Sequence, residues 1–156
     1  MGRHKGFAVP AVNIWGKIIV PHLEAWDGAI RGIEMNLHSR GGAIGIGMLE
    51  YIVDPSIDYS WRQNVHGLTF GAPRYGTDEW AKRMTLHKNK IIRVENKFDP
   101  VPKLPTERRG YTKLMPVLKI HQPWPWAMLP IRSHVWYNIT INSCLTKKAI
   151  DKFNTK

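Results

Sequence analysis

The chain has 156 residues, of which 43% are apolar and 22% are charged. This length and composition predict a single folded domain over residues 1–156 and exclude a chain that is mainly disordered. Lysine and arginine number 23 against 12 aspartate and glutamate residues, so the net charge of +11 favours anionic partners over cationic ones.

Several features that the sequence lacks predict where in the cell the protein is found. A single cysteine, Cys144, excludes a disulfide within the chain and is typical of a reducing compartment. The first six residues have no apolar segment of the kind that a secretory signal carries. No run approaches the ~20 apolar residues that a membrane-spanning helix needs. We therefore expect a cytoplasmic protein or one bound at the periphery of a membrane.

The first half of the chain is predicted to form a helix, a strand and a second helix. Apolar residues at helical spacing predict a helix over residues 11–30, which Pro21 would kink or split. Residues 32–37 form a short apolar run that favours a buried strand. Residues 41–53 follow as a helix with four glycines, each costing roughly 0.5–1 kcal/mol relative to alanine. We expect such a helix to pack closely against a strand.

The second half continues the alternation. Strands are predicted over 65–70 and 90–95, with a helix over 78–84 between them. The three prolines at positions 100, 102 and 105 then require irregular structure, and residues 138–156 predict a strand (138–142) followed by a short helix. Alternating strands and helices indicate an α/β fold, with a mainly parallel sheet flanked by helices.

Ser39 lies in the turn between the first predicted strand and the glycine-containing helix. In a nucleophile elbow, a serine on such a strand–turn–helix has an exposed hydroxyl, and the next backbone N–H can bind an oxyanion. Ser39 is therefore a candidate nucleophile, and the N–H of Arg40 is a candidate oxyanion donor. A serine in a glycine-rich turn is more often structural, so this feature alone decides little.

An acid and a histidine follow Ser39 in the order of the α/β-hydrolase triad. Asp99 comes directly after the strand at 90–95, where catalytic groups collect in open α/β sheets, and His134 follows later. His134 would take the serine proton and Asp99 would orient the imidazole. His38 is a weaker candidate base, because adjacent residues in an elbow point apart. Each residue alone also has a structural interpretation as a turn, core or surface residue.

Several segments resemble the class 3 (fungal-type) triacylglycerol lipase family, in the family's order between residues 4 and 137. Residues 37–43 are similar to its GHSLGGA elbow, and residues 96–105 to its N-x-x-D-x-V-P-x-L-P segment, which carries the triad acid. The other similar segments are residues 4–7 (HxGF), 69–76 (TFGxPRVG), 110–111 (GY) and 134–137 (HxxY).

The resemblance implies an α/β-hydrolase-like fold, shortened at the N-terminus relative to the family. It also implies a carboxylic ester hydrolase that acts on an acylglycerol or a phospholipid through an acyl-enzyme. Ser39, Asp99 and His134 would form the triad, and the Arg40 N–H would contribute to the oxyanion hole. No cofactor is expected, because a triad and backbone dipoles suffice for this chemistry. No metal is expected either, since the seven histidines have no metal-site spacing.

The sequence departs from the family pattern in three places. Leu37 replaces a glycine, which is expected to loosen the elbow, and Arg40 replaces a leucine and adds a cation at the mouth of the site. The loop that supplies the family's second oxyanion contact precedes the HxGF segment, and we expect it to be missing here. Losing one such donor typically costs ~10²–10³ in rate. The same shortening would expose a sheet edge.

These departures keep a second interpretation open, in which a weak or inactive lipase-fold protein serves for binding or assembly. Its partner would be a protein or a second copy at the open sheet edge, or an anionic membrane. Nucleic acid ranks third, because no aromatic–basic recognition motif accompanies the charge. Trp124, Trp126 and Met128 are candidate substrate-binding residues in a proline-rich loop, and an alternative is that they fill the domain's own core.

Overall fold

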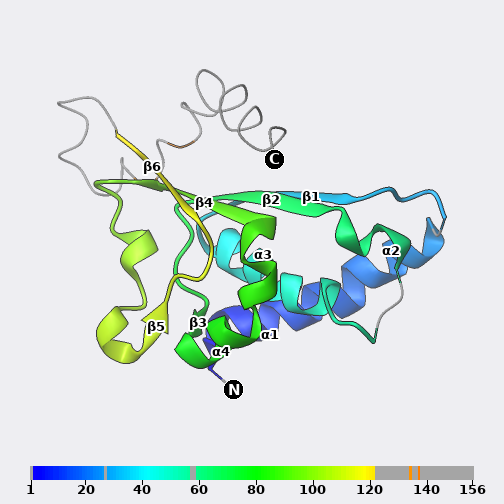
Figure 1. Cartoon of the computed structure of the whole chain (residues 1–156), viewed down its shortest axis with the longest axis horizontal. Coiled ribbons are helices and arrows are strands. Elements are labelled where there is room, and N and C mark those ends of the chain that lie inside the picture. The colour runs from blue at the N-terminus through cyan, green and yellow to red at the C-terminus, as the bar shows by residue number, and fades with distance from the viewer. Residues whose placement is uncertain (1, 27, 57–58, 122–133, 135–136, 138–156) are drawn as a thin grey trace.

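The computed structural model describes residues 2–26, 28–56 and 59–121, together with residues 134 and 137. Within these residues, the central feature is a four-stranded sheet in the order β1-β2-β4-β6 (Figure 1). Its strands are Ile33–His38 (β1), Val65–Phe70 (β2), Ile91–Asn96 (β4) and Val117–Ile120 (β6). The neighbours β1 and β2, β2 and β4, and β4 and β6 all pair in parallel, so the predicted mainly parallel sheet is confirmed.

The N-terminal helix starts earlier than the sequence predicts. Helix α1 (Lys5–Ile14) continues as a π-helix over Trp15–Ile19 and then as α2 (Val20–Ala25). The predicted helix over 11–30 was therefore wrong in both bounds. Near Pro21, where a kink or split is predicted, the helix continues: the π-helix ends at Ile19 and Pro21 lies in the first turn of α2, where its missing N–H is tolerated.

Helix α3 (Ser39–Ile52) connects β1 to the rest of the sheet, and Figure 1 shows α1 and α3 on the same side of that sheet. Helix α4 (Asp78–Arg83) follows β2, and a small antiparallel sheet pairs β3 (Gly76–Thr77) with β5 (Tyr111–Thr112). Single 3-10 turns complete the described elements at Ser60–Gln63, Thr85–Lys90, Val101–Lys103 and Glu107–Arg109. The strand and helix expected within 138–156 lie outside the described residues.

The strands send alternate side chains to two hydrophobic clusters, as the two-residue period of a strand requires. The cluster beneath α3 joins strand residues to Ile46, Leu49 and Ile52 of the helix; the strand residues are Ile33, Met35, Leu37, Val65 and Ile91. The cluster on the other face consists of Phe70, Val94 and Tyr137, with Leu68, Leu118 and Ile120 packed against them. The sheet is thus apolar on both faces, as expected for parallel strands.

Two glycines let α3 lie close to the sheet. A Cβ added to Gly42 would come within 2.6 Å of the Ala72 Cβ and 3.2 Å of the Thr69 Cβ. A Cβ on Gly45 would overlap the Leu37 side chain. The elbow accommodates Leu37 because Gly45 leaves open the space that this leucine fills. The expected close packing of the glycine-containing helix is therefore confirmed, and it fixes the position of Ser39 at the helix start.

A buried arginine holds the turn that follows β2. The Arg93 side chain lies on β4 and is almost fully buried; its Nε donates to Glu95 Oε1 at 3.1 Å. Its terminal nitrogens donate to the carbonyl oxygens of Pro73, at 3.2 Å, and Ala72. Burial lowers the pKa of this guanidinium, and Glu95 opposes the shift. The turn after β2 is thus anchored to the strand that leads to Asp99.

Candidate active site

Ser39 stands at the junction of β1 and α3 with a strained backbone. Its φ is 54°, in the left-handed region that residues other than glycine rarely adopt. Such strain costs on the order of 1–3 kcal/mol and persists where the surrounding packing enforces it. Here the close contact of α3 with the sheet supplies that packing. The turn has the geometry of a nucleophile elbow.

The three residues expected to form a triad are in hydrogen-bonding contact. Ser39 Oγ lies 2.7 Å from His134 Nε2, and His134 Nδ1 lies 2.8 Å from Asp99 Oδ2. A carboxylate oxygen only accepts, so Nδ1 carries the proton and Nε2 is left to accept the serine hydroxyl. The Asp99 side chain is fully buried, whereas 17% of the His134 side chain is exposed. The structure thus brings together residues that are 95 and 35 positions apart.

Asp99 is held by two further donors. The Tyr137 hydroxyl donates to Oδ2 at 2.9 Å, and the Val101 N–H donates to Oδ1 at 2.9 Å. The same tyrosine oxygen accepts the Asn96 N–H at 2.7 Å. Burial, above all, raises the pKa of Tyr137, so its hydroxyl stays protonated and remains a donor. Sequence reasoning did not assign Tyr137 to the site, although the spacing from His134 to Tyr137 was the available signal.

His38 contacts the catalytic histidine candidate from the neighbouring position in the elbow. Its Nε2 donates to the His134 carbonyl oxygen at 3.1 Å, and the two rings are 4.9 Å apart at 30°. His38 therefore supports the main chain of His134, whereas the hydroxyl of Ser39 contacts the His134 ring. No local pattern could have shown this contact, because it joins residues 96 positions apart.

Gly71 closes the site from the turn after β2. Its φ is 60°, and an added Cβ would lie 2.7 Å from Asp99 Oδ2 and 3.0 Å from His134 Nδ1. A side chain at this position would therefore push against Asp99 and His134. The N–H of Gly71 also bonds the Val94 carbonyl at 3.0 Å, which ties the turn to β4.

The remaining sequence-predicted residues have different outcomes. Arg40 follows Ser39 as the elbow requires, and its side chain is exposed, with Nη2 at 3.5 Å from the Gly6 carbonyl oxygen. Trp124, Trp126 and Met128, the candidate substrate-binding residues, lie outside the described residues.

Among the residues that the structure describes, no group of three or more histidine, cysteine, aspartate or glutamate side chains is placed to hold a metal ion. In the same part of the chain, no helix has the length and apolarity to cross a bilayer.

This arrangement can activate a hydroxyl as a nucleophile. His134 Nε2 is within proton-transfer distance of Ser39 Oγ, and the buried carboxylate of Asp99 would stabilise the imidazolium that forms. The positive φ of Ser39 places it in a strained turn between strand and helix, as in a nucleophile elbow. The chemistry that fits is acyl transfer.

Comparison with known proteins finds lipases and a phospholipase. The family model for class 3 lipases matches residues 4–109. A curated relative, the chloroplastic phospholipase A1-Igamma2 of Arabidopsis thaliana, is 30% identical over 131 residues, which cover 80% of this chain and 24% of the relative. This chain thus spans about a quarter of that protein's length.

Solved lipase structures share the fold. The propeptide complex of Rhizomucor miehei lipase aligns with a TM-score of 0.63 at 21% identity, over 79% of this chain and 40% of that one. The N225Q mutant of MDLA from Penicillium cyclopium aligns with a TM-score of 0.66 at 23% identity, over 78% of this chain and 43% of that one. The chain therefore spans about two fifths of these structures, and within that span the α/β-hydrolase-like fold is confirmed.

Proposed function

The chain belongs to the class 3 lipase family, and from that premise we propose that it hydrolyses a carboxylic ester of a lipid. The substrate class is an acylglycerol or a phospholipid. The observation that carries this proposal is the continuous set of hydrogen bonds from Asp99 through His134 to Ser39. The plant relative is a phospholipase A1 and the structural neighbours include triacylglycerol lipases, which supports a lipid ester as the substrate.

In the first half of the reaction, Ser39 Oγ attacks the carbonyl carbon of the ester while its proton passes to His134 Nε2. Negative charge then develops on the carbonyl oxygen, and the Arg40 N–H stabilises it. His134 next protonates the alcohol oxygen as the carbon–oxygen bond breaks. The alcohol leaves, and the acyl group remains on Ser39 as an ester.

In the second half, water replaces the alcohol. His134 takes a proton from the water as its oxygen attacks the acyl-enzyme, and returns that proton to Ser39 Oγ when the tetrahedral intermediate collapses. The fatty acid is released and the free serine is restored. Asp99, fixed by Tyr137 and Val101, keeps the imidazole oriented throughout both halves.

Fatty-acid release measured on emulsified diacylglycerol and on phospholipid micelles tests the proposal. We expect the wild-type chain to release fatty acid from at least one substrate, and Ser39→Ala to release none above background. Ser56→Ala is the matched control, because Ser56 is exposed and bonds only Asp54 among the described contacts. A folded wild-type chain that hydrolyses neither substrate would contradict the proposal, as would equal activity in Ser39→Ala.

A further inference from the structure

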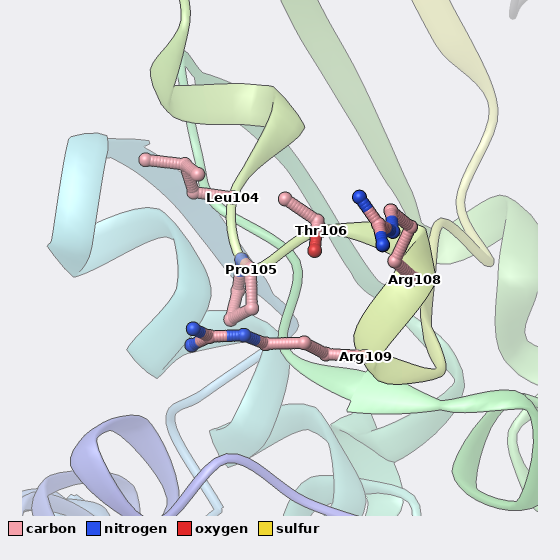
Figure 2. Close-up of a pocket in the computed structure, with 5 residues that line it drawn as sticks. All are labelled: Leu104, Pro105, Thr106, Arg108 and Arg109. Carbon is pink, nitrogen blue, oxygen red and sulfur yellow. The ribbon is translucent and has the colours of Figure 1, made fainter.

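A surface hollow begins shortly after the triad acid. Its volume is about 540 Å³, and it is lined by Leu104, Pro105, Thr106, Arg108 and Arg109 (Figure 2). Small-molecule sites in proteins typically measure about 300–1,000 Å³, so this hollow could hold a group of the size of a lipid headgroup. The catalytic relay uses none of its lining residues.

The wall of the hollow is fixed by a buried arginine. The Arg74 main-chain N–H donates to the Leu104 carbonyl at 2.6 Å, and its guanidinium donates to the Pro105 carbonyl at 2.8 Å. The guanidinium also contacts the Lys103 carbonyl and pairs with the Glu107 carboxylate at 2.6 Å. The loop is thus organised before a ligand arrives, and the acidic side chain within it is already engaged by Arg74.

Two cations line the hollow. Arg108 and Arg109 are exposed, and within the described part of the chain neither forms an ion pair with a carboxylate. In Figure 2 the two side chains leave the turn in different directions, Arg108 beside Thr106 and Arg109 along Pro105 toward the side on which α3 is drawn. Guanidinium groups recognise phosphate oxygens through paired N–H donors, so the positive charge of this hollow suits a phosphate.

The hollow is also connected to the reaction centre through the chain. Leu104 follows Asp99 by five residues (104 − 99), with the single 3-10 turn Val101–Lys103 between them. The Val101 N–H at the start of that turn donates to Asp99 Oδ1. The half-exposed Leu104 and the Pro105 ring supply the apolar part of the lining.

We propose that this hollow binds the phosphate of a glycerophospholipid whose ester lies at Ser39. The Arg109 guanidinium contacts the phosphate oxygens, Arg108 adds positive charge at the same turn, and Leu104 and Pro105 contact the apolar part of the lipid next to them. The inference rests on the proposed ester hydrolysis and names its substrate class. It follows that the protein discriminates between a phospholipid and an uncharged diacylglycerol with the same acyl chains.

A binding experiment tests the hollow without relying on catalysis. Calorimetric titration of Ser39→Ala with monomeric short-chain phosphatidylglycerol is expected to give saturable binding. Adding Arg108→Gln and Arg109→Gln should weaken it about tenfold or more, since a charge-assisted contact of ordinary strength is worth about that factor. Arg31→Gln, which removes one exposed arginine between α2 and β1, is the control for lost surface charge and should leave the affinity unchanged. Equal affinities in the double variant and the control would overturn the proposal.

Two further arms identify the ligand. If inorganic phosphate binds Ser39→Ala as tightly as the phospholipid, the hollow is a site for free phosphate and the lipid assignment is overturned. In the active chain, we expect the ratio of kcat/KM for phospholipid to kcat/KM for diacylglycerol to fall about tenfold in the double variant and to stay constant in Arg31→Gln. An unchanged ratio in the double variant would also overturn it. A wild-type chain that hydrolyses neither lipid would defeat the proposed function. The titration would still show whether the hollow binds the phospholipid.

Discussion

The Tyr137 hydroxyl and the Asp99 carboxylate are joined by a 2.9 Å hydrogen bond on Oδ2, the oxygen that also lies 2.8 Å from His134 Nδ1. The tyrosine thus shares its acceptor with the histidine that contacts Ser39. Because the tyrosine oxygen also accepts the Asn96 N–H, it links the end of β4 to the carboxylate. Asp99 is therefore oriented by fixed neighbours before any substrate binds.

Tyr137→Phe should lower both stability and activity. The change removes the acceptor of the buried Asn96 N–H and one donor to Asp99, and an unsatisfied buried polar group costs about 1–3 kcal/mol. We expect the free energy of unfolding in urea to fall by about that amount and kcat to fall with it. Tyr59→Phe is the control, because the described contact of this ring is stacking on Trp61, and should change the free energy by less than about 0.5 kcal/mol. Equal stabilities for Tyr137→Phe and the wild type would contradict this account.

Adjacent glycines at the start of α3 should respond in opposite ways to alanine. Gly42→Ala forces a methyl group against Ala72 and Thr69, and overpacking of this kind typically costs about 1–3 kcal/mol. Gly41 has open space around it, so Gly41→Ala should stabilise the helix by about 0.5–1 kcal/mol. Thermal and urea unfolding of the two variants measure this difference. Similar stabilities for both would mean that α3 is not pressed against the sheet.

Arg74→Met should loosen the loop that it holds. The substitution removes the donors to the Lys103 and Pro105 carbonyls and the partner of Glu107, while the main-chain bond to Leu104 remains. We expect faster amide hydrogen exchange at Arg109 and Gly110, whose N–H groups bond within this loop. Arg83→Met on α4 removes ion pairs with Glu79 and Glu50, away from this loop, and should leave these amides unaffected. Unchanged exchange in Arg74→Met would show that the loop holds its shape without this arginine.

His38→Phe should reduce the rate without weakening substrate binding. The phenyl ring keeps the contact with the His134 ring but cannot donate to the His134 carbonyl. A single hydrogen bond contributes about 0.5–1.5 kcal/mol, so kcat should fall about 2- to 10-fold with KM unchanged. His38→Gln, which retains a donor, should recover part of the loss. A rise in KM at constant kcat would instead place His38 in substrate binding.

Much of the sheet could be predicted from sequence because its strands are short apolar runs bounded by glycine, proline or a charged turn. Strand β2 has the predicted bounds, and β1 and β4 differ from theirs by one residue at each end. The pair β3–β5 was missed, since strands of two residues show no periodicity. The helix start at Lys5 was missed because the prediction followed apolar residues that begin at position 11, whereas α1 begins six residues earlier.

Some residues of the candidate site could be predicted from the sequence and others could not. Ser39, Asp99 and His134 could be proposed together because they follow one another in the triad order and because Ser39 and Asp99 each come after a predicted strand. Gly71 and His38 could not, because their roles depend on contacts with Asp99, His134 and the His134 carbonyl that form only in three dimensions. The hollow at residues 104–109 depends on Arg74, whose burial no composition or spacing shows.

The most direct measurement is labelling with a fluorophosphonate probe, followed by intact mass spectrometry of the wild type, Ser39→Ala and Ser56→Ala. The probe forms a stable bond only with a serine whose hydroxyl is activated by a base and whose oxyanion is stabilised. We predict one adduct on the wild type and on Ser56→Ala, and none on Ser39→Ala. A folded wild-type chain that takes up no probe, or an adduct that persists in Ser39→Ala, would contradict the assignment of Ser39 as the nucleophile.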